Sequence, residues 1–346
     1  MKREIYVGRV GIGGNHPVSI QSMTTTDTRD YSSTLAQIKR LYIAGCEIVR
    51  VAVPDQESVI SLKTIVSESP LPIIADIHFN PDLALKSIKA GIDGIRINPG
   101  NISSISKLSK IIKTASQHNI PIRIGVNSGS IEKKYQKSGK TRAEMMVDSV
   151  MDKIKFFEDS GFCNIKISLK SSDVKETIKA YRMIDNLCDY PLHLGITEAG
   201  TIFSGTIKSS IGIGSLLADG IGNTIRVSLT DDPVKEIRVA EEILKVLGLK
   251  EKGIEIISCP TCARVSVDLI NIVKKFEERL SKIKTDKNIK IAIMGCEVNG
   301  PGEAKDADIG IAFSKSKAYI FKKGKLIDKL NPENSLEKLI NMVIES

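Results

Sequence analysis

The segment GIRINPGNISSISKLSKIIKTASQHNIPIRIGVN (94–127) contains one complete β-α-β unit. Its two ends, 94–98 and 121–126, are short β-branched runs of the kind found in buried parallel strands. Between them lies an amphipathic run, 103–118, whose apolar face carries Ile105, Leu108, Ile111, Ile112 and Ala115. The segment therefore predicts two parallel strands joined by a crossover helix.

The same alternation continues on both sides of this unit. Strand-like runs lie at 18–23, 47–52, 73–77, 94–98, 121–126, 164–169, 192–197 and 223–229. Helix-like stretches follow them near 33–44, 56–67, 81–90, 103–118, 142–160, 173–187, 205–218 and 233–247. Eight β-α units in roughly 230 residues are typical of an α/β protein with a (β/α)8 TIM barrel. An open, doubly wound sheet is the competing fold.

Both ends of the chain depart from this alternation. Residues 5–10 and the GIGGN turn after them predict a hairpin at the bottom of the barrel. The barrel domain is expected to span 1–247, and the Gly- and Lys-containing segment 248–253 predicts a linker. Residues 254–346 predict a small α/β domain, with a strand, a CPTC segment, a helix near 263–282, a strand at 289–294, β runs at 308–313 and 318–327, and a terminal helix.

The composition narrows the class of protein. The 346 residues are 41% hydrophobic and 26% charged, as in ordinary globular proteins, so wholesale disorder is excluded. The sequence has no apolar run of about 18 residues and starts without a secretory signal, so we expect a soluble cytoplasmic protein that does not associate with a membrane. The net charge of +9 suits an anionic partner, but the lack of Trp and the aromatic content of 4% argue against nucleic acid.

Polar residues gather at the predicted carboxyl ends of the strands, which together with the following loops build the active site of a (β/α)8 barrel. Arg50, Arg96 and Arg123 lie there, and strand alternation allows them to point inward. The other candidates for substrate binding are His78, Asn98, Asn127, Lys170, Arg226 and Ser228. Converging guanidinium groups suit phosphate oxygens, so we expect a cationic pocket for a phosphorylated substrate. The alternative is a set of internal salt bridges to Asp76 and Glu198.

Three thiols lie in the C-terminal segment. Cys259 and Cys262 form a CxxC motif. The third thiol, Cys296, begins the separate segment CEVNGPGE (296–303), which ends in Glu303. A CxxC motif binds an iron–sulfur cluster or zinc, or performs thiol exchange. Structural zinc normally recruits a fourth Cys or His, but no His follows His193, and thioredoxin-type chemistry needs no distant third Cys. This pattern favours an iron–sulfur cluster and leaves zinc and redox thiols as alternatives.

Four stretches carry a resemblance to a known family: LHLGITEAG (192–200), GIGNTIRVSLTDDP (220–233), CPTCAR (259–264) and GCEVNGPGEA (295–304). The chain resembles, over essentially its whole length, the 4-hydroxy-3-methylbut-2-en-1-yl diphosphate synthases of the non-mevalonate isoprenoid pathway, in their bacterial two-domain form. The resemblance implies reductive opening of 2-C-methyl-D-erythritol 2,4-cyclodiphosphate to the allylic diphosphate. That reaction loses water and takes up two electrons, with ferredoxin or flavodoxin as the donor.

The resemblance also implies roles for individual residues. It implies a [4Fe–4S] cluster held by Cys259, Cys262, Cys296 and Glu303. It carries diphosphate-binding roles over to Arg50, Arg96, Arg123, Asn127, Ser228 and a lysine of the sixth strand. For that lysine we favour Lys170 over Lys166, because Lys170 lies nearer the predicted mouth. As a ligand of the cluster iron, the carboxylate of Glu303 would be replaced by a substrate oxygen more readily than a thiolate would. Glu198 is the candidate proton donor to the leaving oxygen.

The length of the linker predicts how two chains assemble. Residues 248–253 span at most about 20 Å at roughly 3.3–3.6 Å per residue. A barrel is itself at least about 20 Å tall, given helices that rise roughly 1.5 Å per residue. After the eighth helix the chain is expected to be back at the bottom of the barrel, whereas the cationic mouth is at the top. The linker is therefore hardly long enough for the C-terminal domain to cover the mouth of its own barrel. We therefore expect a head-to-tail homodimer in which the cluster domain of one protomer covers the barrel of the other, as the resemblance also implies.

A second function remains open at this point. A zinc-stabilised barrel could bind a phosphorylated or pterin-like ligand without redox chemistry, in a manner similar to dihydropteroate synthase. Anaerobic purification separates the two functions. A brown, oxygen-sensitive protein supports the first, and a colourless zinc protein supports the second.

Overall fold

The chain folds into two units, Met1–Leu249 and Lys250–Ser346. The structure is a computed structural model. It describes residues 2–78, 80–98, 104–136, 139–250, 253–280, 283, 285, 287–296, 302 and 307–345. Each unit has its own hydrophobic core and is treated separately below.

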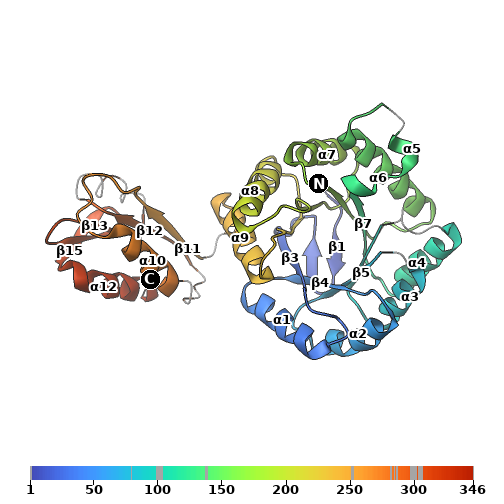
Figure 1. The fold of residues 1–346 in the computed structure, drawn as a ribbon, viewed down its shortest axis with the longest axis horizontal. Coiled ribbons are helices and arrows are strands. Elements are labelled where there is room, and N and C mark those ends of the chain that lie inside the picture. Colours follow the sequence, from blue (N-terminus) through green and yellow to red (C-terminus); the bar gives the residue numbers. More distant parts are fainter. Residues whose placement is uncertain are drawn as a thin grey trace. The chain divides into compact units, whose positions relative to one another are not determined.

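The first unit is a parallel β-barrel surrounded by helices (Figure 1). Its strands are β3 (Ser19–Met23), β4 (Ile48–Ala52), β5 (Ile73–Ile77), β6 (Gly94–Ile97), β7 (Ile122–Asn127), β8 (Ile165–Lys170), β9 (His193–Leu194) and β10 (Thr224–Ile225). They pair in the order β8-β7-β6-β5-β4-β3-β10-β9, and a bridge between Ile167 and Leu192 joins the two ends. The predicted (β/α)8 barrel is therefore confirmed, and the open sheet is excluded.

The helices cover the outside of the barrel. They are α1 (Tyr31–Ile43), α2 (Gln56–Glu68), α3 (Pro81–Lys89), α4 (Ile105–Gln117), α6 (Arg142–Asp159), α7 (Val174–Leu187), α8 (Ile202–Ala218) and α9 (Pro233–Val246). A 3-10 turn (Ser128–Ser130) and the short α5 (Lys133–Gln136) precede α6. Several helices begin at a residue whose side chain accepts a backbone N–H of the first turn, such as Asp55 of α2 and Asp173 of α7. No helix in the described ranges is long and apolar enough to cross a membrane.

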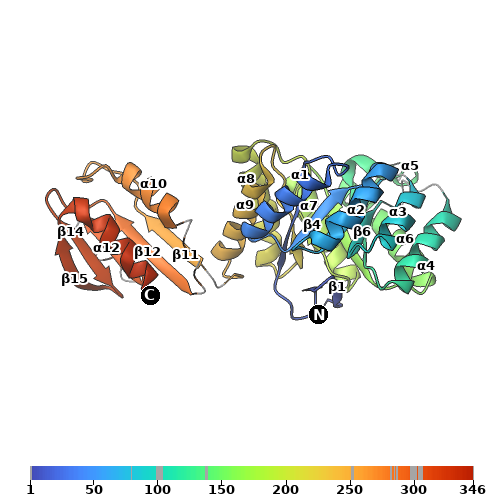
Figure 2. The ribbon, with the colours of Figure 1, turned by 90° about the horizontal axis from the view of Figure 1, so that it is seen from below.

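The N-terminal hairpin covers the bottom of the barrel, as the sequence predicts. Strands β1 (Ile5–Val7) and β2 (Val10–Ile12) pair antiparallel. Their apolar side chains pack against Ile48 and Ile74, which lie near the amino ends of β4 and β5. Figure 2 shows this hairpin at one end of the barrel. The opposite, open end, where the strands have their carboxyl ends, is called the barrel mouth below.

The two strands that close the barrel are shorter than predicted. β9 and β10 have two residues each, where the sequence predicts strands over 192–197 and 223–229. The chain continues past β9 through Gly195, where a Cβ would lie 2.6 Å from the backbone oxygen of Arg226 and 2.5 Å from Nζ of Lys170. A side chain at position 195 would therefore collide with Lys170 and with the backbone of Arg226, so this position requires glycine.

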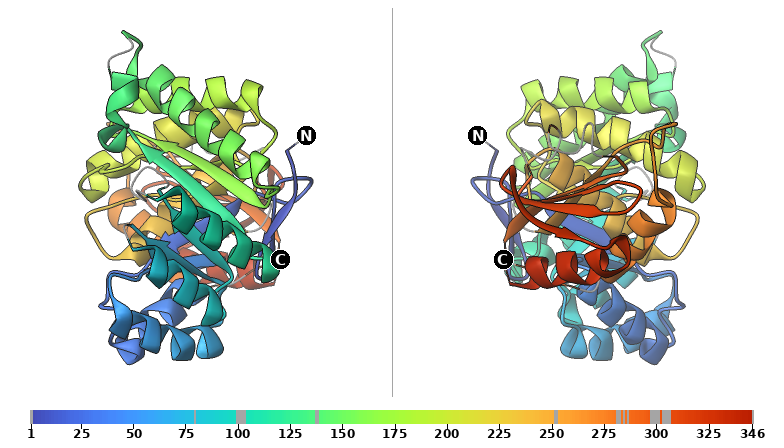
Figure 3. Two further views of the ribbon diagram at one scale, coloured as in Figure 1. Left: turned by 90° about the vertical axis from the view of Figure 1, so that its right-hand side faces the viewer. Right: turned by 90° about the vertical axis from the view of Figure 1, so that its left-hand side faces the viewer.

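The second unit contains a five-stranded sheet, and α10 and α12 are the helices whose bounds the structure describes in it (Figure 3). Its elements are β11 (Gly253–Ser258), α10 (Leu269–Leu280), β12 (Asn288–Met294), β13 (Ile309–Phe313), β14 (Ala318–Lys322), β15 (Lys325–Leu330) and α12 (Pro332–Ile344). The strands pair in this chain order, β11 to β13 parallel and β14 and β15 antiparallel. α10 and α12 pack on the apolar face that contains Ile291 and Ile311.

Two predictions for this unit were wrong in detail. α10 begins at Leu269 and not near residue 263. The run 318–327 is not one strand but part of a hairpin that turns at Lys323 and Gly324. Both turn residues have positive φ angles of 47° and 72°, and the glycine adopts this conformation without steric cost.

The buried side chain of Tyr181 yields a prediction about the seam of the barrel. Its hydroxyl accepts the N–H of Leu169 in β8 at 3.0 Å and donates to the carbonyl of His193 in β9. We expect Tyr181→Phe to lower the free energy of unfolding by about 1–3 kcal/mol, because two buried backbone groups lose their partner. Urea unfolding measures this. Tyr42→Phe is the control, since Tyr42 is 51% exposed, and should change stability by less than about 0.5 kcal/mol. Equal stability of the two variants would contradict this role.

Candidate active site at the barrel mouth

A polar cavity of about 120 Å³ opens at the barrel mouth. Its lining comes from seven of the eight strands or the loops after them: Arg50, Asp76, His78, Arg96, Arg123, Asn127, Ser168, Lys170, Thr197, Arg226 and Ser228. Strand pairing explains the convergence, because Arg96 is the register partner of both Asp76 and Arg123. Register partners on neighbouring strands present their side chains on the same face of the sheet.

Asp76 is the carboxylate that neutralises one side of the cavity. It is 4% exposed, and Arg96 Nη1 donates to its Oδ1 at 3.2 Å. Arg50 Nε lies 3.5 Å from its Oδ2, and His78 Nε2 lies 3.4 Å from the same oxygen. Burial alone would raise the pKa of Asp76, but Arg50, His78, Arg96 and Arg123 outweigh burial and lower that pKa well below its usual range. Asp76 is therefore a permanent anion that fixes two arginines.

Glu236 supplies a second buried carboxylate, which the sequence analysis missed. It lies in the first turn of α9 and is 4% exposed. Its Oε1 accepts the N–H of Leu229 at 2.9 Å and lies 3.6 Å from Arg226 Nη2, and its Oε2 accepts from Ser22 at 3.0 Å. An acidic residue in the first turn of the helix after the last strand is the signal that could have suggested it.

Two lysines of β8 occupy different depths. Lys170 lines the cavity, and its Nζ lies 3.2 Å from Nε2 of the fully buried His193. Lys166 lies deeper, where its Nζ donates to Thr224 Oγ1 at 3.4 Å. Burial first, and then Arg123, lowers the pKa of each lysine well below its usual value. The structure therefore places Lys170, and not Lys166, where it would contact a ligand in the cavity.

The cavity holds more cations than its carboxylates neutralise. Burial first, and then the neighbouring guanidinium groups, lowers the pKa of Arg123 well below its usual value, and burial lowers that of Arg50 to about 10. Among the described residues, Arg123 Nε and Nη1, Arg96 Nε and Arg226 Nε have no hydrogen-bond partner. Buried polar groups without partners are costly. An anion with several oxygens, such as a diphosphate, would satisfy both the charge and the free donors.

Two other predicted residues lie outside the cavity lining. Asn98 is 3% exposed, and its Nδ2 donates to Ser130 at 3.2 Å. Glu198 is exposed in the turn after β9, where its φ of 52° is unusual for a residue other than glycine. The internal salt bridges proposed as the alternative exist for Asp76, but the second buried carboxylate is Glu236. Two further residues of the site were not predicted from the sequence: Ser168, which lines the cavity, and Met23, whose Sδ lies 2.9 Å from Arg50 Nη2.

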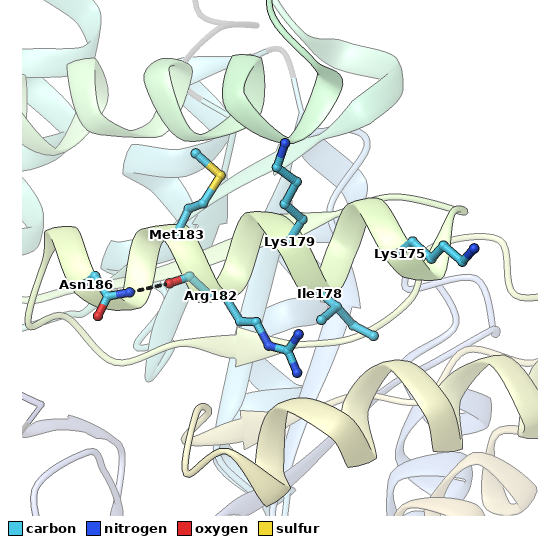
Figure 4. A pocket seen from close by; sticks show the side chains of 6 residues that line it. All are labelled: Lys175, Ile178, Lys179, Arg182, Met183 and Asn186. Carbon is cyan, nitrogen blue, oxygen red and sulfur yellow. Dashed lines mark hydrogen bonds between the residues drawn. The ribbon is translucent and has the colours of Figure 1, made fainter.

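A larger and more open hollow of about 490 Å³ lies along the outside of α7 (Figure 4). Its lining residues all belong to this one helix: Lys175, Ile178, Lys179, Arg182, Met183 and Asn186. The dashed line in Figure 4 marks the bond from Asn186 to the backbone oxygen of Arg182 within the helix. It is an open surface groove without the converging buried charges of the mouth, so the smaller cavity is the better candidate for the active site.

The cysteines of the second unit lie at one edge of its sheet. Cys259 directly follows β11, and Cys296 comes two residues after the end of β12, the parallel neighbour of β11. The N–H of Gly295 donates to Cys259 Sγ at 3.2 Å, and Cys262 is exposed in the segment that follows. In the described part of the chain, no three metal-ligating side chains come together, and Glu303 lies outside the described residues. The soft thiols at one sheet edge still fit an iron–sulfur cluster by their chemistry.

The fold and the mouth together define a class of protein: a (β/α)8-barrel enzyme that binds an anionic substrate at the carboxyl ends of its strands. Residues 2–241 match the GcpE TIM-barrel domain, and residues 255–345 match the GcpE protein C-terminal domain. The chain therefore belongs to the GcpE family, whose members are oxidoreductases named 4-hydroxy-3-methylbut-2-en-1-yl diphosphate synthase.

Curated relatives support this assignment along the whole chain. The 4-hydroxy-3-methylbut-2-en-1-yl diphosphate synthase (flavodoxin) of Clostridium perfringens is 54% identical over 342 residues, which cover 99% of this chain and 97% of the relative. The relative of the same name from Geobacter sulfurreducens is 52% identical and covers 98% of this chain and 96% of its own length. The resemblance read from the sequence is confirmed, and the zinc alternative is not supported.

Solved structures show the likeness of the barrel. A dihydropteroate synthase from Yersinia pestis matches with a TM-score of 0.51 at 9% identity, covering 72% of this chain and 98% of its own. The dihydropteroate synthase from Thermus thermophilus gives a TM-score of 0.51 at 12% identity, with coverages of 71% and 98%. At such low identity these matches show the fold alone.

The unsatisfied charge of Arg123 leads to a prediction in which stability and binding change in opposite directions. We expect Arg123→Met to raise the stability of the ligand-free protein by about 1–4 kcal/mol, since it removes a buried cation whose Nε and Nη1 have no hydrogen-bond partner. The same variant should bind inorganic pyrophosphate at least about tenfold more weakly, because a charge-assisted bond is lost. Thermal unfolding and titration calorimetry measure the two effects. Lys175→Met, which removes an exposed cation from α7, is the control and should change neither quantity. A destabilised variant with unchanged binding would show that Arg123 is structural.

Proposed function

We propose that the mouth binds 2-C-methyl-D-erythritol 2,4-cyclodiphosphate and that the enzyme opens its ring reductively to 4-hydroxy-3-methylbut-2-en-1-yl diphosphate. The reaction takes up two electrons, breaks a carbon–oxygen bond to the diphosphate and releases a hydroxyl as water. The observation that carries this proposal is the excess of buried cations at the mouth, whose free donors match the oxygens of a diphosphate. The names of the curated relatives point to the same product.

The residues of the mouth would perform two tasks in this reaction. Arg96, Arg123 and Lys170 would hold the diphosphate and orient the ring, which lowers the entropic part of the barrier. Opening the ring leaves additional negative charge on the diphosphate, and the same cations would stabilise that charge as it develops. Asp76 and Glu236 keep Arg50, Arg96 and Arg226 in place before the substrate arrives. His78, Asn127, Ser228 and Asn98 complete the proposed binding set. The first three line the cavity, and Asn98 donates to Ser130, whose hydroxyl donates to the backbone oxygen of Asn127.

Electron delivery would depend on a [4Fe–4S] cluster held by Cys259, Cys262, Cys296 and Glu303. When bound, such a cluster would supply single electrons and Lewis-acid chemistry. The support is the soft donor set at one edge of the sheet and the match to the GcpE C-terminal domain. All six cysteines are free, and such thiols persist in a reducing compartment, which supports a cytoplasmic location.

Two further roles complete the proposal. Glu198 would donate the proton to the leaving oxygen; its carboxyl is exposed next to Thr197, which lines the cavity. The electron donor would be flavodoxin, the donor printed in the names of the curated relatives, with ferredoxin as the alternative of the same type. Neither role requires a nucleic acid or a membrane.

An anaerobic assay tests the proposed reaction. Protein reconstituted with iron and sulfide should be brown and should convert the cyclodiphosphate when a strong small-molecule reductant such as dithionite is present. Cys259→Ser and Cys296→Ser should each lose most of their bound iron together with the activity, because a cluster with an incomplete ligand set is unstable. Cys163→Ser is the control, since Cys163 is an exposed thiol of the barrel unit. Iron-replete protein that stays colourless, or thiol variants that keep their iron, would end the proposal.

We also propose that the enzyme is a head-to-tail homodimer in which each barrel mouth meets the cluster domain of the partner. The support is the linker argument: few residues separate α9 from β11, and the barrel is about as tall as the linker is long. In a two-fold dimer, this arrangement forms two equivalent sites. Each site then needs intact residues from both protomers.

Mixing inactive variants tests the dimer. Arg96→Met damages the barrel and Cys296→Ser damages the cluster domain, so an equal mixture of the two should recover about a quarter of the normal activity after subunit exchange, with one intact site in each hybrid. A mixture of Arg96→Met and Arg123→Met is the matched control and should recover none, because every barrel in it is damaged. Absence of recovery in the first mixture, with hybrids shown by mass spectrometry, would contradict shared sites.

A further inference from the structure

One turn of the second unit lies at the same edge of the sheet as the cysteines. Strands β11, β12 and β13 are parallel, so their carboxyl ends share this edge. Met294 pairs with Ala312, which places the end of β13 level with the segment that contains Cys296. Neighbouring strands are about 4.7–4.9 Å apart. The 314–317 turn between β13 and β14 therefore starts about one strand spacing from the strand that leads to Cys296.

This edge carries exposed positive charge. Lys315 and Lys317 lie in the turn, and both are exposed. Lys329 belongs to the same edge, because its register partner Tyr319 is the second residue after the turn. The Nζ of Lys329 lies 5.6 Å from the centre of the Tyr319 ring. We call Lys315, Lys317 and Lys329 the lysine edge.

Other charges at the same end of the sheet do not cancel the lysine edge. Arg264 adds an exposed cation in the segment after Cys262, whereas Asp268 and Glu333 are exposed anions near the starts of α10 and α12. The described residues of this end therefore keep an excess of positive charge.

We propose that the lysine edge is the docking surface for the electron donor, a flavodoxin with net negative charge. This inference rests on the proposed function, since it assumes that electrons enter at the cysteines. Electron transfer falls steeply with distance, so a donor must dock close to the acceptor, and the lysine edge is the charged surface next to Cys259 and Cys296. Complementary charge gives fast association and a short-lived complex, as a shuttling electron carrier needs.

The hairpin itself provides a matched pair of variants. Lys315→Glu with Lys317→Glu reverses the charge at the cysteine edge. Lys322→Glu with Lys325→Glu makes the same change at the other end of β14, where these two lysines are register partners. All four lysines are exposed, so neither double variant disturbs a core. The two variants therefore differ in where the charge changes and not in how much.

The experiment measures binding and turnover with the full-length enzyme under anaerobic conditions. Binding of oxidised flavodoxin, followed by interferometry at low salt, should weaken at least about tenfold in the Lys315 and Lys317 variant and less than about twofold in the control variant. Flavodoxin-driven turnover should fall in parallel, while dithionite-driven turnover stays unchanged in both variants. The dependence of binding on salt concentration should also become shallower in the first variant.

Three results would overturn the proposal. Equal weakening by the two variants would show an effect of overall charge. Unchanged binding in both would show that flavodoxin docks elsewhere. A loss of dithionite-driven turnover in the first variant would show that this edge serves the substrate or the partner protomer. A wild-type enzyme without dithionite-driven turnover would instead refute the proposed function, and the binding comparison would still decide where flavodoxin docks.

Discussion

The buried carboxylate of Asp76 sits between Arg50 and Arg96 at the centre of a barrel that contains more positive than negative side chains. Removing these charges from water is costly, and one carboxylate compensates part of that cost. The remainder is balanced by the hydrophobic packing of the barrel strands against the surrounding helices. The mouth is therefore an electrostatically strained region supported by a rigid, well-packed scaffold, which is the condition for a preorganised anion site.

The two buried carboxylates divide the cations between them. Asp76 lies on β5 and orients one arginine of each neighbouring strand, Arg50 of β4 and Arg96 of β6. Glu236 lies on α9 and contacts Arg226, Ser22 and the backbone N–H of Leu229. It therefore connects α9 both to β3, which contains Ser22, and to the segment after β10, which contains Arg226 and Leu229. Neither carboxylate reaches the two free donors of Arg123. The free donors thus remain on the side of the cavity that a diphosphate would occupy.

The sequence predicted the residues whose position depends on strand periodicity and missed those that depend on tertiary contacts. Arg96 and Arg123 could be found because each lies within an apolar strand, where alternation turns its side chain inward. Glu236 was missed, because an acidic residue in the first turn of an amphipathic helix also fits an ordinary surface role until α9 is placed against β3. The early end of β9 could not be predicted either, because the sequence does not show that Lys170 of β8 packs against Gly195. The hairpin turn at Lys323 was missed because a Lys-Gly pair is a weaker turn signal than Asn-Gly.

The positive charge of the chain has two different physical consequences, and burial decides between them. At the mouth, cations are desolvated and held by neighbours, so they act over a contact distance on a ligand that satisfies their donors. At the lysine edge, the cations are exposed to solvent, so they act through a field that salt screens within about 8 Å at physiological ionic strength. The net charge of +9 does not distinguish these groups. A tight site for a small anion therefore requires the barrel, whereas a brief encounter with a protein requires little more than the exposed edge of a sheet.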